Sequence, residues 1–162
     1  MRVTILGVDP GSRHTGFGVF QGEGDRLNHL ASGSIKAGGN HPLATRLWRI
    51  YDGLAEVIRV HQPQALALEE IFLAANVHTA FTLGQVRGVV LLLGAQNSLP
   101  IFHYAPLAVK KAVVGYGRAS KTQVQLMVGQ LLGQQVADEH AADALAVGLC
   151  HFFHCRWPGG VS

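Results

Sequence analysis

Acidic side chains stand in this sequence at positions where a stable protein core would not place them. Asp9 ends the first apolar stretch of the chain, Glu69 and Glu70 end a second one, and Asp143 interrupts a run of Ala, Leu and Val. An ionised carboxylate is costly to bury unless it pairs with a cation or binds a metal. Because these segments carry little positive charge, a divalent metal ion is the simplest partner, and carboxylate oxygens suit Mg²⁺ or Mn²⁺.

Each of these acids also has a purely structural interpretation. Asp9 precedes a Pro-Gly pair, and Asp is common in such turns. Glu69 and Glu70 could mark the place where a strand reaches water. Successive strand side chains point to opposite faces of a sheet, so only one of the two can join a shared site, and the pattern leaves open which one. Asp143 has the weakest structural explanation, because it lies too deep in its predicted helix to cap it.

His140 is a candidate nitrogen ligand beside Asp143. The two residues are three positions apart, so they share one face of the predicted helix. A neutral imidazole can bind a metal or accept the proton of an attacking water, whereas an isolated helix histidine usually does neither. A second group of candidate ligands follows on the same helix: Cys150, His151, His154 and Cys155. Zinc sites draw ligands from more than one element, so we do not favour a zinc site there.

Apolar periodicity predicts the elements that must position these side chains. Short apolar or β-branched runs bounded by turn residues are typical of strands, and apolar residues recurring every three to four positions are typical of helices. Strands are predicted at residues 3–9, 16–21, 27–36, 65–69 and 100–104. Helices are predicted between residues 43 and 62 and at residues 76–93, 109–114, 120–132 and 138–153. Ser120 and Gln123 predict a capping box at the start of the helix 120–132, and Asp138 is the candidate cap of the last helix. We expect one α/β domain over residues 1–162, built as a mixed sheet with helices on its faces. The last few residues of the chain are expected to form a flexible tail.

Composition and charge distribution favour a folded protein with a polyanionic partner. The chain is 48% hydrophobic and only 14% charged, which is typical of a compact fold. None of its ten carboxylates lies between Ile71 and Ala137. This acid-free stretch is rich in basic residues, an arrangement that suits nucleic acid, although a solvated basic face would have the same sequence pattern. The basic residues are Arg87, Lys110, Lys111, Arg118 and Lys121.

The sequence predicts a cytoplasmic protein without a membrane partner. The apolar start is short and leads directly into Asp9 without a small-residue cleavage site, unlike a secretory signal. The most apolar internal run, residues 89–95, is too short to span a bilayer. Two cysteines without a secretory signal suit a reducing compartment.

Several short motifs occur in order along nearly the whole chain. They are Asp9-Pro10-Gly11-Ser12, Thr15-Gly16-Phe17-Gly18, residues 66–72 (LALEEIF), residues 83–88 (LGQVRG), the basic segment 109–125 and residues 141–146 (AADALA). This ordered set resembles the RuvC family of Holliday-junction resolvases. The Asp-Pro-Gly motif alone is shared with other RNase H-like proteins and related ATPases, so the resemblance depends on the set and its order.

The resemblance implies an RNase H-like fold, with a five-stranded mixed sheet flanked by helices, and a homodimer. It assigns metal-dependent catalysis to Asp9, Glu69, His140 and Asp143, and so chooses Glu69 over Glu70. It implies Mg²⁺ as the cofactor, with two ions in each site and Mn²⁺ able to substitute. Many relatives carry Asp where this chain has His140, which leaves open whether His140 binds metal or transfers a proton.

The resemblance also implies residues that bind DNA. Phe72 matches an aromatic wedge that stacks on the opened bases of the junction, although plain core packing is an equally good interpretation of a phenylalanine. Lys110 and Lys121 match phosphate-contacting lysines, and Lys121 lies just inside a predicted helix N-terminus, which favours anions. The other basic residues of the acid-free stretch complete the candidate DNA-binding set: Arg87, Lys111 and Arg118.

The expected function is the resolution of Holliday junctions in recombination and repair, by two symmetric nicks that leave 5′-phosphate and 3′-hydroxyl ends. The family implies the RuvA–RuvB branch-migration complex as a partner. A related nuclease acting on RNA is disfavoured by the basic segment and Phe72. An ATP-binding phosphotransferase would need a second glycine-rich phosphate loop and a larger chain. A DNA-binding protein without catalysis gives no reason for acids to converge beneath a basic surface.

Overall fold

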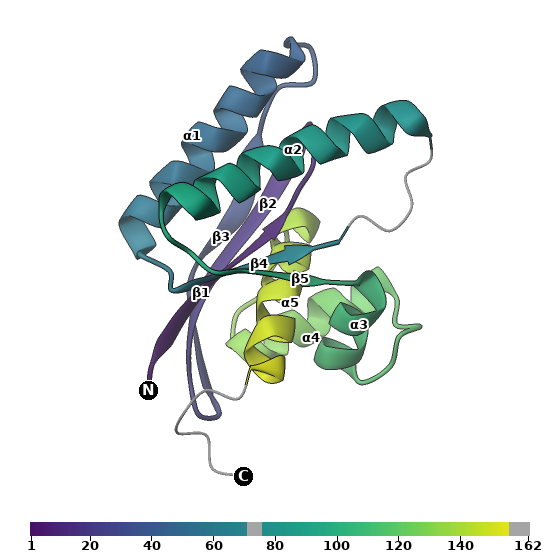
Figure 1. Cartoon of the computed structure of the whole chain (residues 1–162). Coiled ribbons are helices and arrows are strands. Elements are labelled where there is room, and N and C mark those ends of the chain that lie inside the picture. The colour runs from purple at the N-terminus through teal and green to yellow at the C-terminus, as the bar shows by residue number, and fades with distance from the viewer. Residues whose placement is uncertain (71–75, 156–162) are drawn as a thin grey trace.

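The computed structural model describes residues 1–70 and 76–155, and its helices pack on a central five-stranded mixed sheet (Figure 1). The strand order is β3-β2-β1-β4-β5. β1 (Val3–Asp9), β2 (His14–Glu23) and β3 (Arg26–Lys36) are antiparallel neighbours. β4 (Ala65–Glu69) runs parallel to β1, and β5 (Ile101–Tyr104) runs parallel to β4. This confirms the predicted α/β class with a mixed sheet.

Helices cover both faces of this sheet (Figure 1). On one face lie α1 (Leu43–His61) and α2 (Val77–Gln96). On the other face lie α3 (Pro106–Val114), α4 (Lys121–Leu132) and α5 (Glu139–His154). The sheet is therefore the middle layer of three, and its central strands bury side chains on both faces.

The two-residue repeat of the central strands divides their side chains between two cores. Leu6 of β1 and Leu68 of β4 join the core beneath α1 and α2. Ile5 of β1 and Ala67 of β4 join the core beneath α5. Odd-numbered residues of both strands therefore face α5, and this rule extends to the residues that end the strands.

Helix α5 packs against β1 and β2 at glycine positions. A Cβ atom at Gly7 of β1 would collide with the carbonyl oxygen of Ala144, and one at Gly16 of β2 would collide with the carbonyl oxygen of His140. Any side chain at either position would force the helix away from the sheet. The helix backbone can therefore lie directly on these strands because the glycines leave room for it.

The predicted element boundaries agree with the structure to within a few residues. β1 and β4 have the predicted limits. α3 begins at Pro106, three residues earlier than predicted, because proline has the backbone angle of a first helical residue and lacks the N–H that would be unsatisfied there. α2 continues to Gln96, beyond the predicted end at residue 93. Helix ends are the parts of a fold that local periodicity specifies least.

Candidate active site

Two parallel strands bring carboxylates to the same edge of the sheet. Asp9 is the last residue of β1 and Glu69 is the last residue of β4. The strands are paired through Val8 and Leu68, so their ends lie side by side. Asp9 and Glu69 both line a pocket on the α5 side, whereas Glu70 is exposed and lies outside it. The strand alternation thus supplies a geometric reason for Glu69 over Glu70, which the sequence pattern alone left open.

Helix α5 brings the third carboxylate to this pocket. Its N-cap is Asp138, whose Oδ1 accepts hydrogen bonds from the backbone N–H groups of His140 at 2.9 Å and Ala141 at 3.3 Å. The other carboxylate oxygen accepts a bond from the Ser34 hydroxyl of β3 at 2.8 Å. The predicted cap is confirmed, and it ties the start of α5 to the sheet. His140 and Asp143 then line the pocket together, as their spacing predicted.

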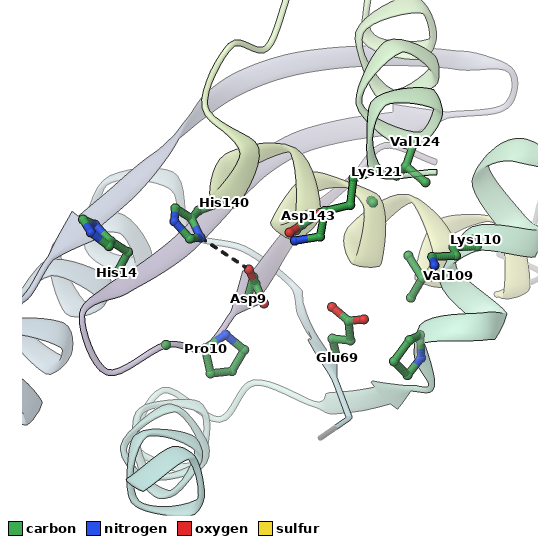
Figure 2. Close-up of a pocket in the computed structure, with 13 residues that line it drawn as sticks. Asp9, Pro10, His14, Glu69, Val109, Lys110, Lys121, Val124, His140 and Asp143 are labelled. Atoms are coloured by element: carbon green, nitrogen blue, oxygen red, sulfur yellow. Dashed lines mark ion pairs between the residues drawn. The ribbon is translucent and has the colours of Figure 1, made fainter. Parts of the chain in front are cut away.

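The pocket has a volume of about 420 Å³. Figure 2 shows the carboxylates of Asp9, Glu69 and Asp143 in its middle, with the two histidines at one side and Lys110 at the other. The apolar part of the lining comes from Pro10, Pro106, Val109, Val124 and Ala146. Asp9, His14, Glu69, Lys110, Lys121, His140 and Asp143 supply the charged and titratable side chains.

Helix α4 directs its N-terminus and Lys121 toward this pocket. The Ser120 hydroxyl accepts a bond from the backbone N–H of Gln123 at 3.2 Å, and Oε1 of Gln123 accepts one from the backbone N–H of Ser120 at 2.8 Å. This confirms the predicted capping box. Lys121 is the first helical residue, so its ammonium group and the positive end of the helix dipole lie at one place. That place favours an anion such as a phosphate.

Crowding raises the pKa values of the three carboxyl groups. Burial, and then the charges of Asp143 and Glu69, raise the pKa of Asp9 to about 7, although Lys121 lowers it. Burial and the charge of Asp143 raise the pKa of Glu69 to about 6, against the opposing effect of Lys121 and Lys110. Burial also raises the pKa of Asp143. The two lysines therefore do not compensate the confined negative charge.

A divalent cation fits this donor set by its chemistry. Three carboxylates and an imidazole are ligands that Mg²⁺ and Mn²⁺ accept, and a cation among them would favour the ionised forms that burial disfavours. Within residues 1–70 and 76–155, no three His, Cys, Asp or Glu side chains are close enough to form a closed metal site. The four predicted ligands share one pocket without converging on a single point, so their role as ligands stays a prediction.

His140 lies beside Asp9 at the edge of the pocket. Its Nδ1 is 3.9 Å from Oδ2 of Asp9, and the side chains are 36% and 23% exposed respectively. Its ring stacks on the ring of His14, with centroids 5.2 Å apart and 13° between the planes. The stack restricts the orientation of the His140 ring. The position suits a metal ligand and a proton acceptor equally well.

His14 is a pocket residue that the sequence analysis missed. It begins β2 and lines the pocket. The antiparallel register pairs Asp9 with Gly16, so His14, two residues earlier in β2, points to the same face. The sequence held a signal for His14, because the short turn after Asp9 must return the chain to the sheet as a neighbour of the first strand. The apolar lining was missed because only the tertiary fold brings α3, α4 and α5 together.

Three further predicted DNA-binding residues, Arg87, Lys111 and Arg118, lie outside the pocket. Arg87 of α2 donates a hydrogen bond to the backbone oxygen of Glu69 and lies 3.0 Å from Nδ1 of His103. It therefore holds the end of β4 from the face of the sheet that α2 covers. Its contact with DNA stays a prediction. Lys111 and Arg118 are exposed on α3 and the loop that follows it. Phe72 lies outside the described residues.

The histidine and cysteine cluster of α5 lies where that helix packs on β5. His151 is buried and shares a hydrogen bond of 2.7 Å with the Tyr104 hydroxyl through its Nδ1. Its ring stacks on Phe102 with centroids 4.1 Å apart. Burial lowers the pKa of His151 to about 4. Cys150 and Cys155 form no disulfide. In this packing the imidazole acts as a buried link between helix and sheet.

Asp9→Asn should stabilise the metal-free protein at high pH. The folded-state pKa values of Asp9 and Glu69 lie above their ordinary values, so the stability they contribute is present at low pH and is lost as pH rises through about 6 to 7. Thermal unfolding in EDTA should therefore show Tm higher for the variant by roughly 2–6 °C at pH 8, with little difference at pH 4. Asp25→Asn, in the exposed hairpin turn, is the control. Equal Tm values for Asp9→Asn and wild type at pH 8 would contradict the crowding of charge.

Comparisons with known proteins agree with this geometry. A family model described as "Crossover junction endodeoxyribonuclease RuvC" matches residues 5–151. A relative of that name from Syntrophotalea carbinolica is 51% identical over 152 residues, covering 93% of this chain and 94% of the relative. Another, from Pelotomaculum thermopropionicum, is 47% identical over 155 residues and 94% of each chain. The solved structure of T. thermophilus RuvC in complex with Holliday junction substrate superposes with a TM-score of 0.89 at 34% identity, covering 94% of each chain. With this fold, this acidic pocket and this similarity over nearly its whole length, the chain belongs to the RuvC family of crossover junction endodeoxyribonucleases.

Proposed function

We propose that this protein is a metal-dependent endonuclease that resolves four-way DNA junctions during recombination and repair. Two symmetric nicks would leave 5′-phosphate and 3′-hydroxyl ends. The observation that carries the proposal is the pocket in which carboxylates of β1, β4 and α5 meet lysines of α3 and α4. Carboxylates can hold cations there, and the lysines can hold phosphate. A member of the same family, T. thermophilus RuvC, has been solved with a Holliday junction.

We infer that Asp9, Glu69, Asp143 and His140 hold two Mg²⁺ ions, for which Mn²⁺ can substitute. When bound, such ions activate water and stabilise the leaving oxygen in phosphodiester hydrolysis. The raised pKa values of Asp9 and Glu69 support this inference, because a cation would return the buried carboxyl groups to their ionised forms.

The protein's own groups bind and orient the DNA strand. Lys110 and Lys121 lie at the pocket wall, where they offset the repulsion between the carboxylates and a phosphate. The N-terminus of α4 adds backbone N–H groups to the same wall. His140 lies beside Asp9, held by its stack on His14, and can accept a proton from the attacking water.

We propose that α2 forms the contact between two copies of this chain. Val77, Phe81 and Leu92 are 72%, 71% and 53% exposed, although α2 also buries an opposite face in the core. A Cβ atom at Gly84 or Gly88 would meet nothing within 4 Å, so this exposed side is open to a close neighbour. By length and composition alone α2 could also cross a membrane. We favour a second copy, because a two-fold dimer matches the approximate two-fold symmetry of a four-way junction.

We also propose a cytoplasmic location, consistent with a DNA substrate and two free cysteines. As a partner we propose the RuvA–RuvB branch-migration complex, on the basis of family membership. Purified RuvA–RuvB should accelerate the cutting of junctions by this protein at limiting protein concentration. An unchanged rate over a titration of the complex would remove it as a partner.

A non-catalytic junction-binding protein is the main competing proposal. It would explain the lysines but not the energetic cost of confining three carboxylates beneath them. The two proposals differ in one measurement, which is the appearance of metal-dependent nicks in bound DNA.

Asp9→Asn and Asp143→Asn should each slow junction cutting by about 100-fold or more while leaving junction binding intact, because each removes a charge needed to hold cations. Glu70→Gln is the matched control, since this neighbouring carboxylate is exposed and lies outside the pocket. The assay uses a labelled synthetic four-way junction and a linear duplex, with Mg²⁺, Mn²⁺ or EDTA. Wild type should nick only the junction, in symmetric pairs, and not in EDTA. Binding without cutting under every metal would overturn the proposed function.

Phe81→Glu should convert the dimer to a monomer, because it places a charge on the exposed apolar side of α2. Sedimentation equilibrium should give twice the chain mass of 17.3 kDa for wild type and the single mass for the variant. Leu126→Glu is the control, since Leu126 is a similarly exposed apolar residue, but of α4 on the other face of the sheet. A monomeric wild type, or a dimeric Phe81→Glu variant, would contradict the α2 interface.

A further inference from the structure

A second basic surface borders the pocket on the side of His14. Its cations are Arg13, Lys36, Arg46 and Arg49, which we call the Arg13 patch. They come from the turn after β1, the end of β3 and the first turns of α1. The sequence has no Asp or Glu from residue 26 to residue 51. His14, which adjoins this surface, lies on the opposite side of the pocket from Lys110 (Figure 2).

Hydrogen bonds hold the backbone of this surface in place. Nη1 of Arg46 donates to the carbonyl oxygen of Ser12 at 3.4 Å, and its Nε donates to that of His41 at 3.2 Å. Nη1 of Arg49 donates to the carbonyl oxygen of Ala37 at 3.3 Å. The backbone N–H of Ala37 in turn donates to the carbonyl oxygen of Arg13 at 2.9 Å. The loops after β1 and β3 are thereby joined to α1 as one surface.

The positive charge of the Arg13 patch has no carboxylate partner in the part of the chain that the structure describes. Among the described residues, no carboxylate oxygen lies within 4.0 Å of the side-chain nitrogens of Arg13, Lys36, Arg46 or Arg49. Asp138, which lies against β3, already binds the Ser34 hydroxyl and the first N–H groups of α5. The N-terminus of α1 has no side-chain cap and no acidic residue in its first turn. This end of the helix dipole therefore adds to the positive potential.

The patch is continuous with the pocket through His14. Arg13 precedes His14 in the chain, and Lys36 is the register partner of His14 across β2 and β3. His14 lines one side of the pocket, and Lys110 lies at the other side, with the carboxylates between them (Figure 2). The acidic groups thus lie between two separate basic surfaces, the Arg13 patch and the side formed by α3 and α4.

We propose that the Arg13 patch binds the phosphate backbone of a junction arm, on the side of the cut phosphate opposite Lys110 and Lys121. A DNA strand that crosses the pocket must continue beyond it in both directions. The three carboxylates repel its phosphates, so attraction on one side alone would draw the strand away from the carboxylates. Cations on both sides hold the cut phosphate over the acids. This inference rests on the proposed function.

Arg13→Gln/Lys36→Gln tests the inference. These two side chains are exposed, whereas Arg46 and Arg49 also support the loops and are left unchanged. The control is Arg2→Gln/Arg26→Gln. It removes two exposed cations, Arg26 at the far end of the β2–β3 hairpin and Arg2 beside it. The control and the test variant therefore have the same net charge. Binding of a labelled four-way junction is measured by fluorescence anisotropy in EDTA, so that no cutting occurs, at several salt concentrations.

The double variant should bind the junction at least about tenfold more weakly at low salt. Its plot of log Kd against log salt should flatten by about 1 for each phosphate that the protein no longer neutralises. The control should stay within about twofold of wild type. Equal affinity and slope for the two double variants, with wild type binding and cutting normally, would overturn the inference alone. Failure of wild type to bind or cut the junction would instead overturn the proposed function. Circular dichroism of each variant checks that the fold is intact.

Discussion

Helix α5 crosses β1 and β2 at a distance that glycine permits, since a methyl group at Gly7 or Gly16 would collide with carbonyl oxygens of that helix. The register partner of Asp9 in β2 is Gly16. The first turn of α5 therefore rests on a position without a side chain, directly beside Asp9. This backbone contact brings His140 and Asp143 to the strand ends. A bulkier sheet surface would keep the same residues in the same order but would separate the carboxylates that form the pocket.

The carboxylates confined in the pocket destabilise the folded protein, and interactions elsewhere in the fold must offset this cost. Burial and mutual repulsion raise the pKa values of Asp9 and Glu69, so the site opposes folding unless a cation or a proton offsets its charge. Packing around the site stabilises the fold and offsets this cost. Two apolar cores enclose the sheet, and His151 connects α5 to β5 through Tyr104. Proteins commonly tolerate such local cost where function requires it.

The parts of the fold that depend on local sequence pattern were predictable. The parts that depend on contacts between segments distant in the sequence were not. A run of apolar and β-branched residues ended by a Pro-Gly turn predicted the limits of β1, and the hydrogen-bonding capacity of Ser120 predicted the start of α4. Asp9 and Asp143 stood out because their neighbours are apolar. The choice of Glu69 came from family resemblance, and the structure adds the strand geometry that accounts for it. The grouping of Arg13 with Arg49 depends on two loops meeting α1, which no local pattern encodes.

The pKa of about 7 at Asp9 means that the metal-free pocket retains a proton near neutral pH for much of the time. A cation that enters the pocket competes with that proton, because a carboxylate must be deprotonated to bind metal. Metal uptake at neutral pH would therefore release protons, and the apparent affinity for metal would fall as the solution becomes more acidic. A calorimetric titration would register this as a binding enthalpy that changes with the ionisation enthalpy of the buffer. The crowding that makes the pocket costly would in this way make the loading of the enzyme sensitive to pH.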